Sequence, residues 1–285
     1  MMALILDGNA LASIIKTRLK DEAQELLTAG IRPGLGTILV GSDPSSARYV
    51  AMKHADCAEV GIESFHCKLD QDATMEELLE AIDLFNGDSN VDSILLQLPL
   101  PKHLDQLAAL LAIDPNKDVD GLHPVNLGKL VMSEPGPLAC TPAGIVELLI
   151  HYGIEIAHKH VVVVGRGLTI GRPLSLLLAS KSPNCNATVT VAHTGTADLG
   201  SITRQADILI AAAGVADIIT ESMVKEGAVV VGAGTPFVDG KLRSDLSDSV
   251  AKVASAITPR IGGVGPMTRA MLLVNAIQAA KGRLI

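Results

Sequence analysis

Tyr49 and Lys53 are four positions apart in the segment Tyr49-Val50-Ala51-Met52-Lys53. On a helix, this spacing places a phenolic hydroxyl and a primary amine on one face, about one turn apart. Such a pair could share a proton or hold a substrate between its two groups. Because most pairs with this spacing lie on solvent-exposed helix faces, the spacing by itself makes Tyr49 and Lys53 candidates and no more.

A glycine-rich turn, Gly165-Arg166-Gly167 with Gly171, follows the apolar run 161–164 and precedes an apolar helix-like run. A strand, a glycine turn and a helix in this order let backbone N–H groups approach a pyrophosphate. The spacing G-x-G-x-x-x-G is one residue longer than the common fingerprint, so a turn that uses glycine only for tight packing remains the alternative. Short-chain dehydrogenases also carry Tyr-x-x-x-Lys, but their glycine turn precedes it, and the reverse order here excludes that class.

The residues after the second strand of this unit, expected at 187–192, bear on the choice of cofactor. NAD sites usually present an acidic residue about 20 positions beyond the glycines, where it binds the ribose 2′-hydroxyl. Here the chain reads His193-Thr194, without a carboxylate, and Arg166 supplies a cation in the glycine turn. A 2′-phosphate is therefore favoured, which predicts NADP, although His193 and Thr194 could simply end the strand.

Three further segments hold candidate residues. Gln97 follows an apolar run, at the end of a strand where open α/β sheets place ligands, or it belongs to an ordinary proline-rich exit. Asp120 lies in the turn-rich loop 114–124 and either binds a heterocycle rich in N–H groups or forms a turn. The segment 262–268 is a backbone-rich turn before the last helix, either a nest that contacts a ligand or a flexible cap.

The pattern of apolar runs predicts the elements that must position these residues. In the first half, strands at 36–40, 62–67 and 93–98 alternate with helices, one of which begins at the capping box Thr74–Glu77. In the second half, the runs 161–164, 187–192, 208–212 and 228–231 are continuously apolar, which is typical of parallel strands buried on both faces. A helix from Cys140 to about Tyr152 marks a domain boundary, and a last helix runs from Thr268 to about Lys281.

Composition excludes several classes of protein. Of 285 residues, 48% are apolar and 19% are charged, which is enough to build the core of one large or two ordinary domains. The formal charge of −8 and the five aromatic residues disfavour nucleic acid and anionic membranes as partners. Four scattered cysteines give no zinc motif, so no metal site is predicted, and they fit a reducing cytoplasm. The start of the chain lacks a signal pattern, and no run is long enough to span a bilayer.

Six segments in this order resemble the bifunctional methylenetetrahydrofolate dehydrogenase/methenyltetrahydrofolate cyclohydrolase family over nearly the whole chain. The resemblance implies a homodimer of subunits with two α/β domains and the folate in the cleft between them. One domain, residues 1–139 plus 266–285, would bind folate and include the returning last helix; the other, 140–265, would be a Rossmann-type NADP-binding domain. The segments are Tyr49–Lys53, Gln97–Pro101, Asp118–Pro124, Cys140–Pro142, the glycine turn with Arg172-Pro173, and Gly262–Thr268.

The resemblance also implies the chemistry and the residues that perform it. The family oxidises 5,10-methylenetetrahydrofolate with NADP and hydrolyses the methenyl product to 10-formyltetrahydrofolate, in the one-carbon metabolism that feeds purine, methionine and histidine biosynthesis. Lys53 would be the catalytic amine, Tyr49 would stack on the folate, Gln97 would assist Lys53, and Asp120 would bind the pterin. The resemblance places the cofactor on Gly165, Arg166, Gly167, Thr194 and Thr235, and further substrate contacts on Gly262 and Pro266.

Three departures from the family pattern affect what the resemblance implies. Gly232 stands where the family usually has an aspartate near the nicotinamide, and Ala55 stands where a second lysine is frequent. The family usually has a proline before Gly262-Gly263, and here Arg260-Ile261 intervene. These changes bear on cofactor affinity and on the balance of the two activities. A dehydrogenase without efficient hydrolysis, and a binding protein without turnover, are therefore the alternatives.

Overall fold

The structure is a computed structural model that describes residues 3–238 and 240–284. The chain divides into two compact units, which we name after their candidate residues. The Lys53 unit comprises Ser13–Cys140 and Arg269–Ile285, and the glycine-loop unit comprises Met1–Ala12 and Thr141–Thr268. The chain passes between them within three helices, α1 (Gly8–Thr28), α6 (Cys140–His151) and α9 (Val264–Lys281).

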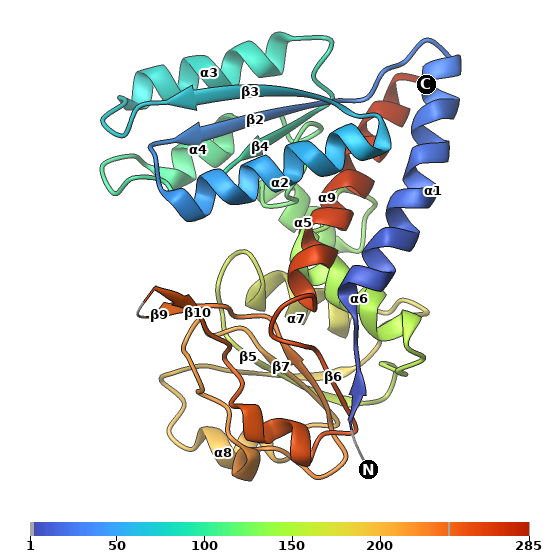
Figure 1. The fold of residues 1–285 in the computed structure, drawn as a ribbon, viewed down its shortest axis with the longest axis vertical. Coiled ribbons are helices and arrows are strands. Elements are labelled where there is room, and N and C mark those ends of the chain that lie inside the picture. The colour runs from blue at the N-terminus through green and yellow to red at the C-terminus, as the bar shows by residue number, and fades with distance from the viewer. Residues whose placement is uncertain (1–2, 239, 285) are drawn as a thin grey trace. The chain divides into compact units, whose positions relative to one another are not determined.

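The Lys53 unit is built on a three-stranded parallel sheet in the order β3-β2-β4 (Figure 1). The strands are β2 (Gly34–Val40), β3 (Glu63–Leu69) and β4 (Ser93–Leu96), which confirms the three strands expected in this half and shifts their ends by a few residues. The other elements are α2 (Pro44–Val60), α3 (Met75–Gly87), α4 (Gln106–Ala112), α5 (Pro124–Met132) and the short η3 (Gly282–Leu284).

Helices α2 and α3 cover opposite faces of this sheet. A Cβ on Gly36 would point at the Phe85 ring of α3. The side chain of the next residue, Thr37, instead hydrogen-bonds His54 of α2. Successive residues of a strand point to opposite faces, so the two helices lie on either side of β2. Helix α3 begins at the capping box that the sequence predicts, with Thr74 accepting from the N–H of Glu77 and the Glu77 carboxylate accepting from that of Thr74.

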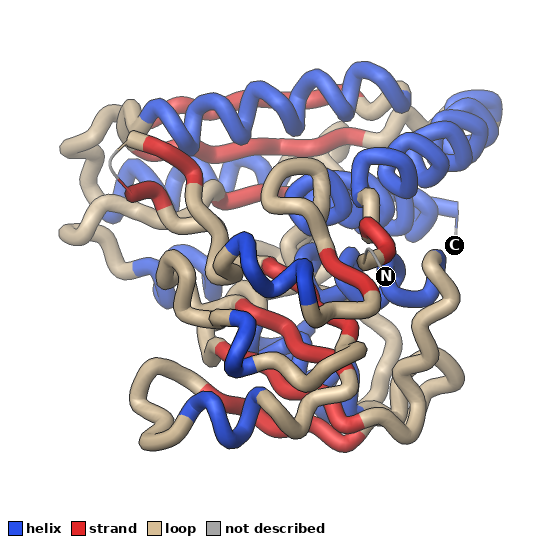
Figure 2. The backbone as a smooth tube through the Cα atoms, turned by 60° about the horizontal axis from the view of Figure 1, so that its bottom comes forward, coloured by secondary structure: helices blue, strands red, loops and turns tan. Residues whose placement is uncertain are grey.

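The glycine-loop unit holds a six-stranded parallel sheet in the order β1-β11-β8-β7-β5-β6, drawn in red in Figure 2. The order reverses between β5 and β7, as in doubly wound nucleotide-binding folds. Four predicted strands are confirmed as β5 (His160–Val164), β6 (Thr188–Ala192), β7 (Ile208–Ala211) and β8 (Val229–Gly232). The remaining elements are β1 (Leu4–Ile5), α7 (Gly171–Ala179), α8 (Leu199–Thr203), η1 (Glu221–Met223), the antiparallel pair β9 (Phe237–Val238) and β10 (Lys241–Leu242), η2 (Asp248–Lys252) and β11 (Ala256–Ile257).

The structure corrects two expectations. The strand expected at 187–192 is not buried on both faces: β6 lies at the sheet edge, and Val191 is 46% exposed. The expected first domain began at residue 1, but residues 1–12 belong to the glycine-loop unit because β1 pairs with β11. Two-residue strands carry too short a pattern to be read from sequence.

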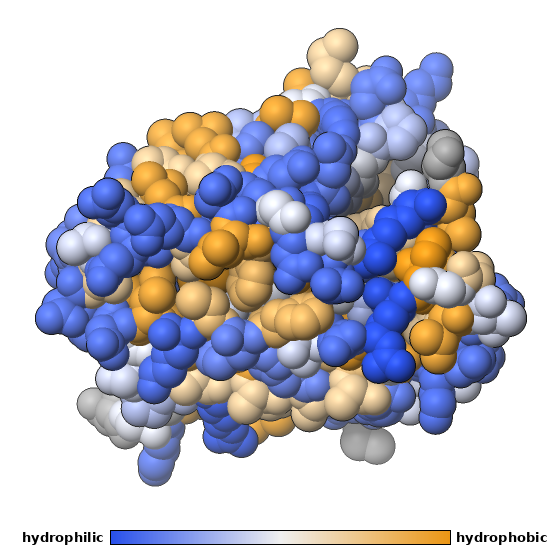
Figure 3. Space-filling view, turned by 90° about the horizontal axis from the view of Figure 1, so that it is seen from above, coloured by the Kyte–Doolittle hydropathy of each residue, from blue (hydrophilic) through white to orange (hydrophobic). Residues whose placement is uncertain are grey.

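No helix among the described residues combines the length and apolar character needed to cross a bilayer. The face shown in Figure 3 carries small apolar groups separated by hydrophilic residues.

Candidate functional site

Helix α2 carries Tyr49 and Lys53 on one face. The helix begins after Asp43, whose carboxylate accepts from the N–H of Ser46, and ends at Gly61, which adopts a positive φ of 88°. Lys53 is only 5% exposed, and its Nζ lies 5.4 Å from the centre of the Tyr49 ring. The sequence alone allowed Tyr49 and Lys53 to lie on a solvent-exposed helix face. The burial of Lys53 excludes that alternative, and it is unusual, because a lysine normally keeps its charge in water.

Gln97 directly joins this pair. The Lys53 amine donates to Gln97 Oε1 at 3.2 Å, and Gln97 Nε2 donates to the Leu98 carbonyl at 2.7 Å. The second bond fixes which end of the amide faces Lys53. Gln97 stands at the carboxyl end of β4, directly before the cis Leu98–Pro99 bond.

Asp120 belongs to the same cluster because its loop runs beside β4. The N–H of Ile94 donates to the Lys117 carbonyl at 2.6 Å, and the N–H of Val119 donates to the Ile94 carbonyl at 3.3 Å. Burial raises the pKa of Asp120, while the positive charge of Lys53 and a hydrogen bond from Cys140 lower it in part. Lys53, Gln97 and Asp120 therefore bring an amine, an amide and a carboxylate into one group.

The pKa of Tyr49 connects it to the same group. Burial raises the pKa of the Tyr49 phenol, Arg269 lowers it, and Asp120 raises it. The phenol therefore remains protonated near neutral pH and can donate a hydrogen bond.

Two ordered residues beside Asp120 carried no assigned role in the sequence analysis. The Cys140 thiol donates to the Val119 carbonyl at 3.3 Å, and Asn275 of α9 donates to the carbonyls of Val119 and Leu138 at 2.8 and 2.9 Å. In the sequence, Cys140 was noted as the start of a helix and within one of the six family-like segments, with no chemical role. Asn275 could not be related to Val119, because the two are 156 positions apart. These bonds hold the loop that carries Asp120.

A charged residue on the same face of α2, Asp56, was also missed. Asp56 is three positions after Lys53, and its carboxylate pairs with Arg269 at 2.8 Å and Lys16 at 3.4 Å. The i, i+3 spacing from Lys53 was the one available signal, because it places Asp56 on the helix face of Tyr49 and Lys53.

The glycine turn fits a dinucleotide by its shape. Gly165 adopts φ 143°, and a Cβ there would overlap the Ala212 carbonyl; a Cβ on Gly171 would overlap Gly165. These two glycines are required by chain packing, as the alternative interpretation held. A Cβ on Gly167, however, would meet no atom within 4 Å, and no side chain caps the start of α7. The turn thus leaves open backbone at Gly167, which suits a pyrophosphate, although the N–H of Arg172 already donates to the Gly167 carbonyl at 3.1 Å and Pro173 has no N–H.

The other predicted cofactor residues follow strands of the same sheet. Arg166 and Thr194 are exposed and follow β5 and β6, which are neighbours, with Val164 opposite Ala192. Thr235 is exposed and follows β8. All three therefore lie beyond the carboxyl ends of parallel strands, where this class of fold binds ligands.

Gly262 and Pro266 belong to the glycine-loop unit, not to the Lys53 unit. Gly262 adopts φ 87°, its carbonyl accepts from the N–H of Asn9 at 3.1 Å, and Pro266 lies in the first turn of α9. Ile261 is 75% exposed and Arg260 is exposed, so these two departures lie at the surface.

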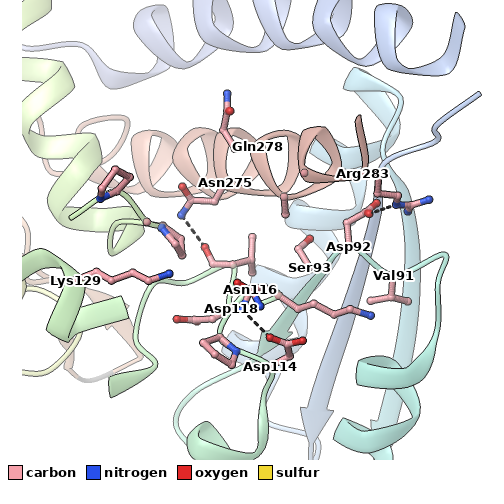
Figure 4. Close-up of a pocket in the computed structure, with 18 of the residues that line it drawn as sticks. Val91, Asp92, Ser93, Asp114, Asn116, Asp118, Lys129, Asn275, Gln278 and Arg283 are labelled. Carbon is pink, nitrogen blue, oxygen red and sulfur yellow. Dashed lines mark hydrogen bonds and ion pairs between the residues drawn. The ribbon is translucent and has the colours of Figure 1, made fainter. Parts of the chain in front are cut away.

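The Lys53 unit also contains a cavity of about 850 Å³, shown in Figure 4. Asn275, Gln278 and Arg283 border it from α9 and the residues beyond, and Arg283 pairs with Asp92. Lys53, Tyr49, Gln97 and Asp120 do not line this cavity, but the cavity adjoins their cluster, because Val119 and Asn275 border it and lie beside Asp120.

Comparisons with known proteins agree with the geometry. The sequence profile of the tetrahydrofolate dehydrogenase/cyclohydrolase catalytic domain matches residues 6–120, and that of its NAD(P)-binding domain matches residues 139–284. A bifunctional methylenetetrahydrofolate dehydrogenase/cyclohydrolase from Campylobacter jejuni is 44% identical, with 99% of each chain covered and a TM-score of 0.95.

Two other solved structures are similar in the same way. The enzyme from Trypanosoma brucei, solved with NADP cofactor and an inhibitor, is 39% identical, covers 100% of this chain and 99% of its own, and has a TM-score of 0.94. The bifunctional enzyme from Thermoplasma acidophilum is 32% identical over 98% and 99% of the two chains, with a TM-score of 0.90. Because the two family profiles together match most of both units, this chain belongs to the tetrahydrofolate dehydrogenase/cyclohydrolase family.

Proposed function

We propose that this chain oxidises 5,10-methylenetetrahydrofolate with NADP and hydrolyses the methenyl product to 10-formyltetrahydrofolate, with Lys53, Tyr49, Gln97 and Asp120 at the catalytic centre. Family membership supports both reactions. The observation that carries the residue assignment is the buried Lys53 amine bound to Gln97, next to the Tyr49 ring and under the charge of Asp120.

In the oxidation, the residues of this chain orient the folate and do not themselves react with it. NADP, held by the glycine turn, would supply the hydride acceptor for the methylene carbon, so no side chain would need to take a proton from that carbon. The Tyr49 ring offers a flat surface for the folate, and the Asp120 carboxylate accepts hydrogen bonds from N–H groups of the pterin. Holding the substrate in one orientation is the main contribution of these groups to the rate.

The hydrolysis needs proton transfers that the oxidation does not. A water adds to the methenyl carbon and loses a proton, and a ring nitrogen must take up a proton when its bond to that carbon breaks. In this proposal Lys53 exchanges these protons, and the hydrogen bond from its amine to Gln97 Oε1 supports that role. The buried Lys53 amine, which hydrolysis would use and oxidation would not, favours a cyclohydrolase over a dehydrogenase without hydrolysis.

The cofactor contacts are proposed from the glycine-loop unit. Gly165, Gly167 and the start of α7 would surround the pyrophosphate, Arg166 and Thr194 would bind the 2′-phosphate, and Thr235 would reach the nicotinamide ribose. Exposure of Arg166, Thr194 and Thr235 beyond the carboxyl ends of their strands supports this arrangement. Gly262 and Pro266 are proposed as substrate contacts on the strength of the resemblance.

A homodimer is proposed as well. Strand β6 ends the six-stranded sheet with one side unpaired among the described residues, and the 46% exposed Val191 adds apolar surface there. The unpaired N–H and C=O groups of an edge strand can pair with those of a second chain. A cytoplasmic location is proposed as well, supported by the four free cysteines. A role in supplying purine, methionine and histidine biosynthesis is proposed from the reaction.

A direct test mixes the purified chain with 5,10-methylenetetrahydrofolate and either NADP or NAD, and follows the absorbance of the reduced nicotinamide. Decay of added methenyltetrahydrofolate is then followed without cofactor. NADP-dependent reduction with accelerated decay is expected. Reduction without accelerated decay would identify a dehydrogenase alone, and NADP-dependent thermal stabilisation without turnover would identify a binding protein.

A further inference from the structure

The loop after β7 lies at the point where the nucleotide-binding sheet reverses its strand order. Ala212 donates to the Val164 carbonyl at 2.7 Å, and the Ala212 carbonyl fills the space beside Gly165, so the loop borders the first glycine of the turn. Ligands of doubly wound sheets occupy the crevice at this reversal. The backbone of Ala213–Val215 is therefore a wall of the proposed NADP site.

A single buried carboxylate holds this wall. Asp245 Oδ2 accepts from the N–H groups of Ala213 at 2.6 Å and Gly214 at 3.1 Å, and its Oδ1 accepts from that of Val215 at 2.9 Å. The Asp245 residue is fully buried, whereas the Val215 side chain is 42% exposed. The loop thus turns its N–H groups inward to Asp245 and its side chain outward.

Gly234 makes room for this carboxylate. A Cβ at Gly234 would overlap the Asp245 side chain, and the N–H of Asp245 donates to the Gly234 carbonyl at 3.2 Å. The same stretch contains Gly232, where the family usually has an aspartate. A Cβ at Gly232 would meet Leu246 and Ser244, so this chain fills that space from the segment containing Asp245.

We propose that Asp245 is a positioning residue for NADP, which sets the conformation of the loop Ala213–Val215 by accepting its three consecutive N–H groups. This inference rests on the proposed function. Asp245 does not touch the cofactor; it acts through the loop. Removing one of its acceptor oxygens would leave at least one of these backbone N–H groups without its partner, which would release the loop from this conformation.

The first test is Asp245→Asn, because one amide oxygen replaces two carboxylate oxygens and the new NH₂ group faces a backbone N–H. Titration calorimetry should show NADP binding weakened about tenfold. Hydrolysis of methenyltetrahydrofolate, measured without NADP, should stay within about twofold of the wild type. Asp207→Asn is the matched control: Asp207 also accepts a backbone N–H, from His160, the first residue of β5, at 3.0 Å, and the substitution should leave NADP binding unchanged.

Gly214→Ala tests the loop without altering Asp245. Gly214 adopts φ 68°, and a Cβ there would meet no atom within 4 Å, so the substitution strains only the loop backbone. It should weaken NADP binding in the same way. Gly227→Ala is its control, since Gly227 has φ 80° and equally open surroundings in the turn before β8.

Folded Asp245→Asn with wild-type NADP affinity would overturn the inference and leave Asp245 with a role in folding alone. If Asp245→Asn does not fold, Gly214→Ala decides, and wild-type affinity in that variant overturns the inference. A wild-type chain that hydrolyses methenyltetrahydrofolate but binds no NADP would instead contradict the dehydrogenase half of the proposed function.

Discussion

Arg269 Nη1 lies 2.8 Å from Asp56 Oδ2, and the two side chains are 18% and 10% exposed. The pair joins α9 to α2, the helix that presents Tyr49 and Lys53. A double-mutant cycle with Asp56→Ala and Arg269→Met should give a coupling energy of about 1–3 kcal/mol in the free energy of unfolding, because the pair is largely shielded from water.

The control cycle uses Lys252 and Glu221, which are 3.8 Å apart and 72% and 42% exposed. It should give less than about 0.5 kcal/mol, because solvent screens an exposed pair. Equal coupling in the two cycles would show that the Asp56–Arg269 contact contributes no more than a surface ion pair.

Replacing Lys53 separates the two proposed activities. Lys53→Met should lower the hydrolysis rate by at least about 100-fold, since proton transfer by a positioned group is commonly worth that factor. NADP affinity should be unchanged, because the proposed cofactor residues lie in the other unit. The decay of methenyltetrahydrofolate gives the hydrolysis rate, and titration calorimetry gives the NADP affinity. Near-normal hydrolysis in this variant would show that Lys53 is not the catalytic amine.

Two glycines of the turn should respond differently to alanine. Gly165→Ala should lower both the melting temperature and NADP affinity, because its Cβ would overlap the Ala212 carbonyl and its φ is 143°. Gly167→Ala should weaken NADP binding while leaving the melting temperature unchanged, since its Cβ meets no atom of the chain within 4 Å. Gly87→Ala, in equally open surroundings at the end of α3, should leave NADP affinity unchanged and should not lower the melting temperature. Normal NADP affinity in Gly167→Ala would mean that the cofactor does not approach this backbone.

A histidine pair beside β2 should make the stability of the fold depend on pH. Thr37 Oγ1 lies 2.9 Å from His54 Nε2 and 3.0 Å from His66 Nδ1, and burial together with His66 lowers the pKa of His54 from 6.5. A histidine whose pKa is lower in the folded state stabilises the fold above its unfolded pKa and loses that contribution as pH falls.

The melting temperature should therefore drop between pH 7 and pH 5, and by less in His54→Gln, which cannot take up a proton. Differential scanning calorimetry at several pH values measures the difference. The same drop in wild type and variant would assign the pH dependence to other groups. His103→Gln, at a histidine that bonds the Ala73 carbonyl instead, is the matched substitution.

The local pattern of apolar and capping residues was sufficient to predict the main strands and helices. The apolar runs at 161–164, 208–212 and 228–231 predicted buried parallel strands, and the capping box at Thr74 predicted the start of α3, because burial and capping depend on residues close in sequence. The glycine turn was likewise recognisable, since it needs a strand before it and a helix after it.

Tertiary structure decided what depends on distant residues. The Lys53–Gln97 bond joins positions 44 apart, the Asp245–Ala213 bond joins positions 32 apart, and β1 completes a sheet whose other strands all lie beyond residue 159. The sequence determined by itself which residue types could do chemistry and which segments form strands and helices. Only folding decided which amide orients Lys53, which carboxylate holds the loop after β7 and which strand ends the sheet, because such contacts depend on chain packing and have no fixed spacing.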